Sequence, residues 1–196
     1  MKKRDLELLY EIGSLRLIPR AWIQHLGLPV ASTLEHTVRV IYLALLIAHE
    51  EGVKKSDEKI IKMALIHDVV EARVADLAYV HKVYSVQDEK RAAEDMFADT
   101  DFGDLHTHFK AYEKRDSIEA KIVKDADNLD IDLELKELEE QGSKLPAKLR
   151  GMRVMVRNKK LYTKTAKKLW DAIDKSNPAQ WHMLANKWKK IPTAGR

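Results

Sequence analysis

The sequence predicts an all-α fold, a compact bundle of helices. Only seven glycines and five prolines occur in 196 residues, too few for the many turns of an all-β fold. Apolar residues recur at helical spacing along most of the chain. This length suits one hydrophobic core, so we expect residues 1–196 to form a single domain.

The composition excludes several classes of protein. The chain has no cysteine, which excludes disulfides, thiolate metal ligands and a cysteine nucleophile. Its longest apolar run, VIYLALLIA at 40–48, is shorter than the roughly 18 residues of a membrane span, and the N-terminus lacks the apolar core of a signal peptide. We therefore expect a cytoplasmic protein that does not bind a membrane.

The first expected helix, 5–18, has Leu and Ile at helical spacing. It ends before Pro19, because proline disfavours helix in the residue that precedes it. Residues 19–33 contain two prolines, a glycine and several small residues, so we expect a loop there. Ser32 or Thr33 is then the N-cap of the next helix.

The next two helices are expected to form the centre of the core. Residues 35–52 are apolar around most of the helix circumference and end at Gly52, which predicts a buried helix. Ser56 is the expected N-cap of a helix over 57–73, since two acidic residues follow it directly. A less regular segment follows this helix.

The remaining elements are expected on the same criteria. They are a helix over 87–98, a loop or broken helix entry over 99–108, one long helix or two over 109–140, and helices over 147–157, 162–175 and 181–190. Gly142 and Pro146 precede the helix over 147–157, and Asn177 and Pro178 mark a turn before the last helix.

The last part of the chain, 141–196, has fifteen lysines and arginines but only two acidic residues, whereas the rest is net acidic. Such a region can bind nucleic acid or an anionic small molecule, or it can simply form a solvated helix surface. Its lysines interleave with an ordinary helical apolar pattern, and the spacing of Trp170, Trp181 and Trp188 fits helix packing better than base stacking. We expect a solvated surface and no nucleic-acid partner.

The stretch ALIHDVVEAR, 64–73, has apolar residues at helical spacing but also three polar residues that are costly to bury without partners. His67, Asp68 and Glu71 lie within one turn of the expected helix and can face one small volume. For an isolated His-Asp pair, the simpler interpretation is one buried hydrogen bond to the histidine and acids that reach water.

Two other apolar segments contain similar groups. They are His36 in the expected central helix and Asp125 and Asp127 in the segment AKIVKDADNLDIDLEL. Histidine and carboxylate ligands on packed helices bind divalent cations, and a cation neutralises acids that repel one another in low dielectric. It also lowers the pKa of a water ligand and polarises a phosphoryl oxygen. The pattern therefore predicts a divalent-metal site.

The order EHT (35–37), HD (67–68) and KDAD (124–127) resembles the H…HD…D signature of the HD-domain metal-dependent phosphohydrolases. The stretch LIHDVVEARVADL also resembles the HDxxE…DL pattern of one branch, which contains the bacterial 5'-deoxynucleotidase and the HD-domain-containing protein 2 family. The resemblance implies an HD-domain helical bundle, with a metal-site core at about 30–140 and the basic region 141–196 packed on it.

In that family the first His, the His-Asp pair and the last Asp bind one divalent metal. The resemblance assigns these roles to His36, His67, Asp68 and Asp127. Asp127 is favoured over Asp125 because the family's ligand follows Ala in an Ala-Asp-x-Leu step. These ligands do not distinguish among Mn, Co, Mg, Zn, Fe and Ni.

Two further carboxylates match catalytic positions of the family. Glu71 matches the residue that orients or deprotonates the attacking water. Asp76 matches a residue near the phosphate that is able to protonate the leaving group. Two carboxylates in different surroundings can take opposite acid and base roles, and which residue takes which role stays open. Ala75 stands where the family usually has Gly.

Arg20 and Trp22 resemble the family's phosphate-binding arginine and the tryptophan that packs near the sugar. Ala21 separates them here, whereas the deoxynucleotidase has the two residues adjacent. An arginine fork suits a phosphate, and an indole against the sugar can discriminate against a 2'-hydroxyl by crowding it.

The resemblance thus implies a divalent-metal phosphohydrolase, most simply a 5'-nucleotidase for (deoxy)nucleoside 5'-monophosphates, and it suggests a homodimer. Two alternatives stay open. One is an HD-type hydrolase of a triphosphate, a cyclic nucleotide or an alarmone. The other is a regulatory module that binds metal and nucleotide without turnover, although such a module has less need of Glu71 and Asp76.

Overall fold

The computed structural model describes residues 2–26 and 30–184 of the chain. This described part is helical, as predicted, and its β structure is an isolated bridge between Pro19 and Ser32. The helices in chain order are α1 Lys3–Gly13, the 3₁₀ helix η1 Ser14–Leu17, α2 Ile23–Leu26, α3 Thr33–Glu50, the 3₁₀ helix η2 Lys54–Ser56, α4 Asp57–Ile66, α5 Glu71–Val74, α6 Tyr79–Tyr84, α7 Glu89–Phe97, α8 Gly103–Lys114, α9 Ile118–Glu140, α10 Leu145–Lys159, α11 Lys164–Asp174 and α12 Gln180–Met183.

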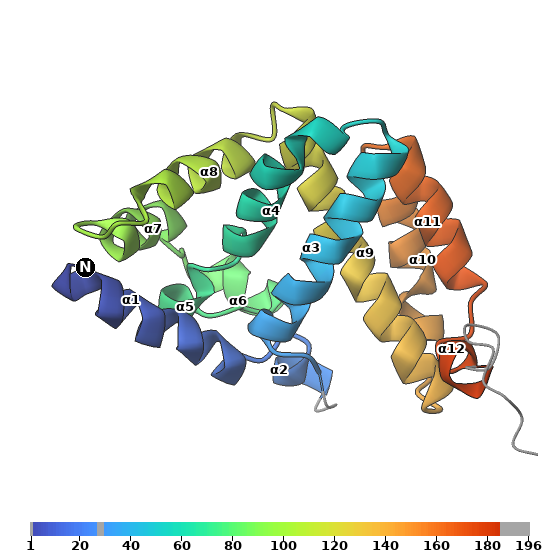
Figure 1. Ribbon diagram of the computed structural model, residues 1–196. Helices are drawn as coiled ribbons and strands as arrows, with labels where there is room; N and C mark the ends of the chain where they lie inside the picture. Colours follow the sequence, from blue (N-terminus) through green and yellow to red (C-terminus); the bar gives the residue numbers. More distant parts are fainter. Residues whose placement is uncertain (1, 27–29, 185–196) are drawn as a thin grey trace, which may run out of the picture.

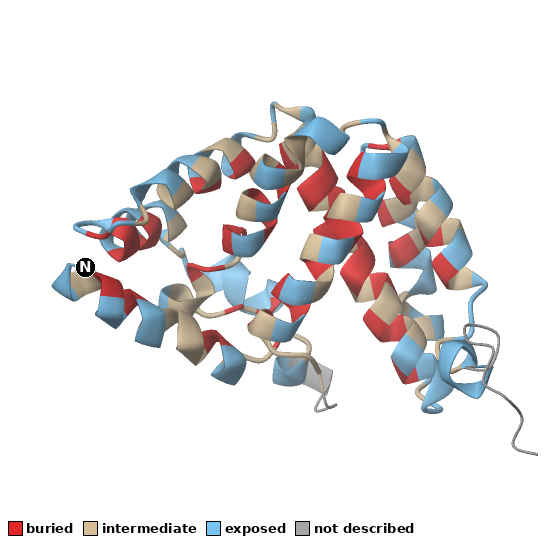
Figure 2. Ribbon diagram, in the orientation of Figure 1, coloured by how far each residue is buried: buried red, intermediate tan, exposed pale blue. Residues whose placement is uncertain are grey.

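Helices α3 and α9 pack against each other in the middle of the molecule (Figure 1). Helices α4 and α8 contact α9 on one side of it, and α1, α5 and α7 lie farther out on that side. Helices α10 and α11 cover the other side of α9. Figure 2 shows that the buried positions of these helices turn toward the interior. Because α9 has neighbours on both sides, it is buried around most of its circumference.

The buried apolar side chains form two clusters. One lies among α3, α4, α9 and α11 and includes Ile47 and Leu129. The other lies among α1, α7 and α8 and includes Leu8 and Met96. Helix α4 contributes to both clusters, since Ile66 at its end belongs to the second. Full burial of such a side chain stabilises the fold by about 1.5–3 kcal/mol, so both ends of α4 are held firmly.

Two helix starts follow from serine caps. Ser32, one of the two expected caps, begins α3 through a capping box with Glu35. The span 109–140 forms two helices rather than one, because Arg115 adopts a left-handed conformation with φ of 55° after α8. Ser117 then begins α9 by accepting a hydrogen bond from the Ala120 amide.

The helix expected over 57–73 is interrupted, which corrects that prediction. Helix α4 ends at Ile66, and the chain then turns with hydrogen bonds between residues three apart, such as Val69 N to Ile66 O at 3.2 Å. The Nδ1 atom of His67 lies 2.7 Å from the Ala64 carbonyl oxygen. A continuing helix would use this carbonyl for the Asp68 amide, so the histidine side chain and the tighter turn replace the helical bond.

Other predicted boundaries also change. The first helix is α-helical to Gly13 and continues as η1, which reaches Leu17. The expected loop 19–33 contains α2, and α6 lies in the segment that the sequence left irregular. The broken helix entry expected over 99–108 becomes the start of α8 at Gly103. The last expected helix, 181–190, overlaps α12, and its part from 185 onward lies outside the described residues.

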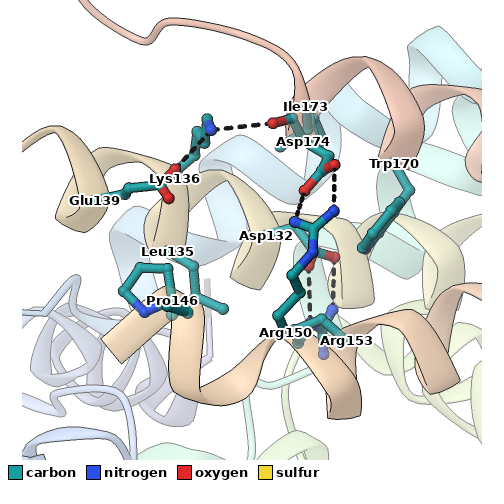
Figure 3. A pocket seen from close by; sticks show the side chains of 11 residues that line it. Asp132, Leu135, Lys136, Glu139, Pro146, Arg150, Arg153, Trp170, Ile173 and Asp174 are labelled. Carbon is teal, nitrogen blue, oxygen red and sulfur yellow. Dashed lines mark hydrogen bonds and ion pairs between the residues drawn. The ribbon is translucent and has the colours of Figure 1, made fainter. Parts of the chain in front are cut away.

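A pocket between α9, α10 and α11 is lined by charged side chains in matched pairs (Figure 3). Arg153 donates two hydrogen bonds to the Asp132 carboxylate, at 2.8 and 2.6 Å, and Arg150 does the same to Asp174. Lys136 bridges from α9 to the Asp174 carbonyl oxygen at 3.0 Å. We call this region the ion-pair pocket. It attaches α10 and α11, which we call the basic helices, to α9.

In the part of the chain that the structure describes, no helix is both long enough and apolar enough to cross a membrane.

Candidate metal centre

Four side chains from three separate segments converge on one small volume. His36 lies in the first turn of α3, His67 and Asp68 in the turn after α4, and Asp127 in α9. The Nε2 atom of His36 lies 3.2 Å from Nε2 of His67, 3.4 Å from an Asp68 oxygen and 3.3 Å from an Asp127 oxygen. One ligand atom from each residue lies within 4.8 Å of the other three. We call these four residues the metal cluster.

The metal cluster fits a divalent cation. Two imidazole nitrogens and two carboxylate oxygens are the donors that Zn²⁺, Mn²⁺ and related ions accept. Ligand atoms that are each about 2.0–2.2 Å from one ion are about 3–4 Å apart, which matches the observed spacing. The structure brings Asp127 to this cluster and not Asp125, as the sequence pattern favours.

The pKa values of two members of the metal cluster are strongly shifted, in opposite directions. Burial disfavours the imidazolium form of His36, yet hydrogen bonds with Asp127, Asp130 and Asp68 outweigh it and raise its pKa well above the usual range. Burial also opposes ionisation of Asp68, yet the charge of His67 and the hydrogen bond with His36 hold its pKa well below the usual range. A metal therefore competes with a proton on His36, and its binding releases that proton.

Three carboxylates gather around the guanidinium of Arg20, which is itself buried. Its Nη1 atom lies 3.1 Å from an Asp68 oxygen, 3.3 Å from an Asp76 oxygen and 3.8 Å from an oxygen of Glu71. Burial, together with the charges of Asp68 and Asp76, raises the pKa of Glu71 to about 9. Thr33 donates a hydrogen bond to Oε2 of Glu71 at 2.7 Å, which fixes the carboxyl in place.

The segment after Arg20 holds Asp76 in position. The Ala21 amide donates to the Asp76 carboxylate at 2.9 Å. Gln24 donates to the Asp76 carbonyl oxygen at 2.5 Å and accepts from the Ala78 amide at 3.0 Å. Ala75, directly before Asp76, has φ of 60° and ψ of 163°, a conformation that favours glycine. The chain thus accepts backbone strain next to the second carboxylate expected to act in catalysis.

Two further predicted positions differ in what surrounds them. Trp22 is half-buried in the turn before α2, next to the Ala21 amide that binds Asp76. Asp125, which the sequence pattern leaves out of the ligand set, is fully buried on another side of α9. Its carboxylate accepts hydrogen bonds from the Tyr162 and Thr163 amides at 2.7 and 2.8 Å, so it attaches the start of α11.

Sequence reasoning missed two residues that touch the metal cluster. Asp130 lies 2.5 Å from Nδ1 of His36, and Lys124 donates to the second oxygen of Asp127 at 2.7 Å. Both lie three residues from Asp127 in α9, on opposite sides of it in the sequence. That spacing places side chains on one helix face, so an i, i+3 search from Asp127 would have found them.

A sequence model of the HD domain matches residues 12–170, most of the chain. The chain therefore belongs to the HD domain family, and the assignment made from its motifs is confirmed. Within that family, it is 29% identical to the 5'-deoxynucleotidase HDDC2 of Danio rerio over 161 residues, which cover 79% of this chain and 78% of the relative. It is 26% identical to the human 5'-deoxynucleotidase HDDC2 over 142 residues, 69% of this chain and 68% of the relative.

Solved structures agree on the fold. A conserved hypothetical protein of Pyrococcus furiosus superposes with a TM-score of 0.73 at 26% identity, covering 87% of this chain and 99% of that one. A predicted metal-dependent phosphohydrolase of Magnetospirillum magnetotacticum superposes with a TM-score of 0.66 at 22% identity, covering 87% and 89%. The all-α fold expected for an HD domain is thereby confirmed.

Proposed function

We propose that this protein is a divalent-metal-dependent phosphohydrolase that releases phosphate from nucleoside 5'-monophosphates, deoxyribonucleotides in particular. The observation that carries the proposal is the metal cluster with Glu71, Asp76 and Arg20 beside it. The HDDC2 relatives, named 5'-deoxynucleotidases, support this substrate class.

In this proposal His36, His67, Asp68 and Asp127 hold one divalent cation. When bound, the ion supplies Lewis-acid polarisation of a phosphoryl oxygen and makes water more acidic. Arg20 binds the phosphoryl oxygens, because its buried guanidinium already faces the same carboxylates and presents several N–H donors. Trp22 lies against the sugar.

Glu71 orients the attacking water and accepts its proton at Oε1, since Thr33 occupies Oε2. This role requires an ionised carboxyl, and a nearby divalent charge lowers the pKa of Glu71 from its raised value. Asp76 donates a proton to the 5'-oxygen that leaves phosphorus. The Ala21 amide and Gln24 keep its carboxyl at the site during this transfer.

We further propose that residues 1–196 form a single domain, since the HD-domain match spans 12–170 and the basic helices pack on α9. The proposed state is a cytoplasmic homodimer without a nucleic-acid partner, which rests on the family resemblance and on the ion pairs that engage the basic residues of the ion-pair pocket. Light scattering coupled to size exclusion tests the dimer directly.

The activity is tested with chelator-stripped protein to which manganese, cobalt or magnesium is returned. Phosphate release is measured from a panel of ribo- and deoxynucleoside 5'-monophosphates. We expect release from deoxynucleoside monophosphates with at least one metal, and slower release from the ribonucleotides. Metal binding without phosphate release from any member of the panel would contradict the proposal. Hydrolysis of triphosphates or cyclic nucleotides instead would indicate another HD-type reaction.

A further inference from the structure

The two imidazoles of the metal cluster are oriented by different kinds of acceptor. Nδ1 of His67 lies 2.7 Å from the backbone carbonyl oxygen of Ala64, whereas Nδ1 of His36 lies 2.5 Å from the side chain of Asp130. An imidazole that donates its Nδ1 proton carries its lone pair on Nε2. The Nε2 atoms of the two histidines both face the metal cluster, and they lie 3.2 Å from each other.

Asp130 is itself held from its other side. Its second oxygen accepts a hydrogen bond from Nε of Arg39, which lies one turn after His36 in α3. The Nη1 atom of Arg39 donates to Glu137 at 2.7 Å, nearer the surface. Asp130 is almost fully buried, so a carboxylate there needs both hydrogen-bonded partners. The result is a continuous chain of contacts from Glu137 to His36.

We propose that Asp130, oriented by Arg39, is a positioning residue for the metal. It fixes the Nδ1-protonated tautomer and the ring angle of His36, so that Nε2 presents its lone pair to the ion. Asp130 touches neither the ion nor the substrate and acts through His36. The inference rests on the proposed function insofar as His36 is a metal ligand, but it concerns metal affinity rather than nucleotide turnover.

Helix α9 offers a matched control for a merely structural role. Asp132 lies two residues after Asp130, is also buried, and also pairs with an arginine, Arg153. The hydrogen bonds of its carboxylate are to Arg153 in the ion-pair pocket, whereas those of Asp130 are to His36 and Arg39. Removing either carboxylate breaks a buried ion pair, whereas only the Asp130 substitution changes the acceptor for His36.

The test uses the full chain as wild type, Asp130→Asn and Asp132→Asn, each stripped with chelator. Zinc affinity is measured by competition with a chromophoric chelator, without nucleotide. We expect Asp130→Asn to weaken zinc binding by about 10- to 100-fold, the usual effect of removing a ligand's hydrogen-bond partner. Asp132→Asn is expected to bind zinc as tightly as wild type. Equal affinities for the two variants would overturn the proposal.

A spectroscopic measurement separates tautomer control from a general loss of order. In long-range ¹H–¹⁵N spectra of the zinc-loaded protein, we expect both cluster histidines to be protonated on Nδ1. In Asp130→Asn the His36 Nδ1 proton should shift or broaden while His67 keeps its signal. An unchanged His36 signal would contradict the proposal.

Arg39→Gln keeps the test decisive if Asp130→Asn does not fold, because Arg39 is partly exposed and its loss leaves Asp130 in place. We expect a several-fold loss of zinc affinity and a shifted His36 signal. Wild-type affinity with an unchanged signal would overturn the role of Arg39. Since no nucleotide is present, failure of the phosphate-release assay leaves these outcomes unaffected, and the two proposals fail separately.

Discussion

The metal cluster and the ion-pair pocket lie on different sides of α9, and both contain charged side chains. In the ion-pair pocket Arg153 faces Asp132 and Arg150 faces Asp174, each through two hydrogen bonds (Figure 3). Beside the metal cluster, the guanidinium of Arg20 instead faces three carboxylates. Paired charges hold helices together in the first region, whereas the second has surplus negative charge.

This difference explains the raised pKa of Glu71. A buried pair with complementary hydrogen bonds satisfies both of its members. Acids that crowd one cation repel one another, and Glu71 shows this repulsion and its burial through a raised pKa. A divalent cation supplies the positive charge missing beside Arg20, whereas in the ion-pair pocket Arg150 and Arg153 already balance their acids.

The largest expected effect comes from breaking the metal cluster at Asp68. One Asp68 oxygen lies 3.2 Å from Nε2 of His67 and 3.4 Å from Nε2 of His36. We expect Asp68→Ala to weaken metal binding by more than about 100-fold, since loss of an outer partner alone costs 10- to 100-fold. Calorimetry with manganese measures it. Asp125→Asn, a buried acid attached to Thr163, should keep the metal, and an equal loss there would refute the assignment.

Substitution of Glu71 distinguishes holding a metal from using it. We expect Glu71→Gln to bind metal as wild type does but to lower kcat by about 10²- to 10⁴-fold, the usual contribution of a general base. Phosphate release at saturating substrate, together with metal affinity, gives both quantities. If Glu71→Gln loses metal as severely as Asp68→Ala, then Glu71 is a ligand.

Truncation in the ion-pair pocket should affect stability alone. The Arg153 side chain is 6% exposed, so Arg153→Ala leaves Asp132 buried without its arginine. We expect the free energy of unfolding to fall by about 3–5 kcal/mol in urea titration, with metal affinity unchanged. Arg150 is 59% exposed, and Arg150→Ala should cost less than about 1 kcal/mol. If Arg153→Ala loses metal affinity, the ion-pair pocket is not purely structural and the proposed difference between the two regions is wrong.

The raised pKa of Glu71 predicts a pH dependence of the chelator-treated protein. A carboxyl whose pKa is about 9 when folded and 4.5 in its model state binds more protons when folded, so wild-type stability falls as pH rises between these values. Glu71→Gln removes this loss and should be more stable than wild type by about 4–5 kcal/mol at pH 8. At pH 4 the two should unfold alike. If thermal melts show the same difference in stability between the two proteins at pH 4 and at pH 8, the raised pKa of Glu71 is disproved.

The smallest expected effect concerns backbone strain at the edge of the site. Ala75 has φ of 60° and ψ of 163°, which glycine adopts freely. We expect Ala75→Gly to raise the free energy of unfolding by about 1 kcal/mol in urea titration. Ala78, with φ of −61°, is the control, and Ala78→Gly should lower stability. A loss in both variants would show that Ala75 is not strained.

The sequence predicted the helical fold and the residues that converge, because burial periodicity and ligand order are properties of the chain itself. It also located the start of α3 to within one residue, since Ser32 is one of the two expected N-caps and caps this helix in the structure. The end of α4 at Ile66 was missed because no glycine or proline marks it. The turn there depends on a contact between His67 and the Ala64 carbonyl, which helical periodicity does not reveal.

The roles of the acids in α9 show the same limit at the site. Motif order distinguished Asp127 from Asp125, yet it did not reveal that Asp125 holds the amides of Tyr162 and Thr163. Asp130 was missed because its importance depends on His36, which lies 94 residues away in the sequence. Its spacing from Asp127 makes it a candidate in the sequence, but its contact with His36 is seen only when the helices are packed.

Helix α9 places its acids at fixed angles around one axis. Asp127 and Asp130 serve the metal cluster, whereas Asp125 and Asp132, seven residues apart, attach the basic helices. Each residue turns an α-helix by about 100°, so one residue inserted between 125 and 132 would rotate the acids before it relative to those after it. Asp125 and Asp132 could then no longer both reach their partners. Length changes should therefore be tolerated in the turn before α10 but not within α9, whose rotational phase links the site to the rest of the bundle.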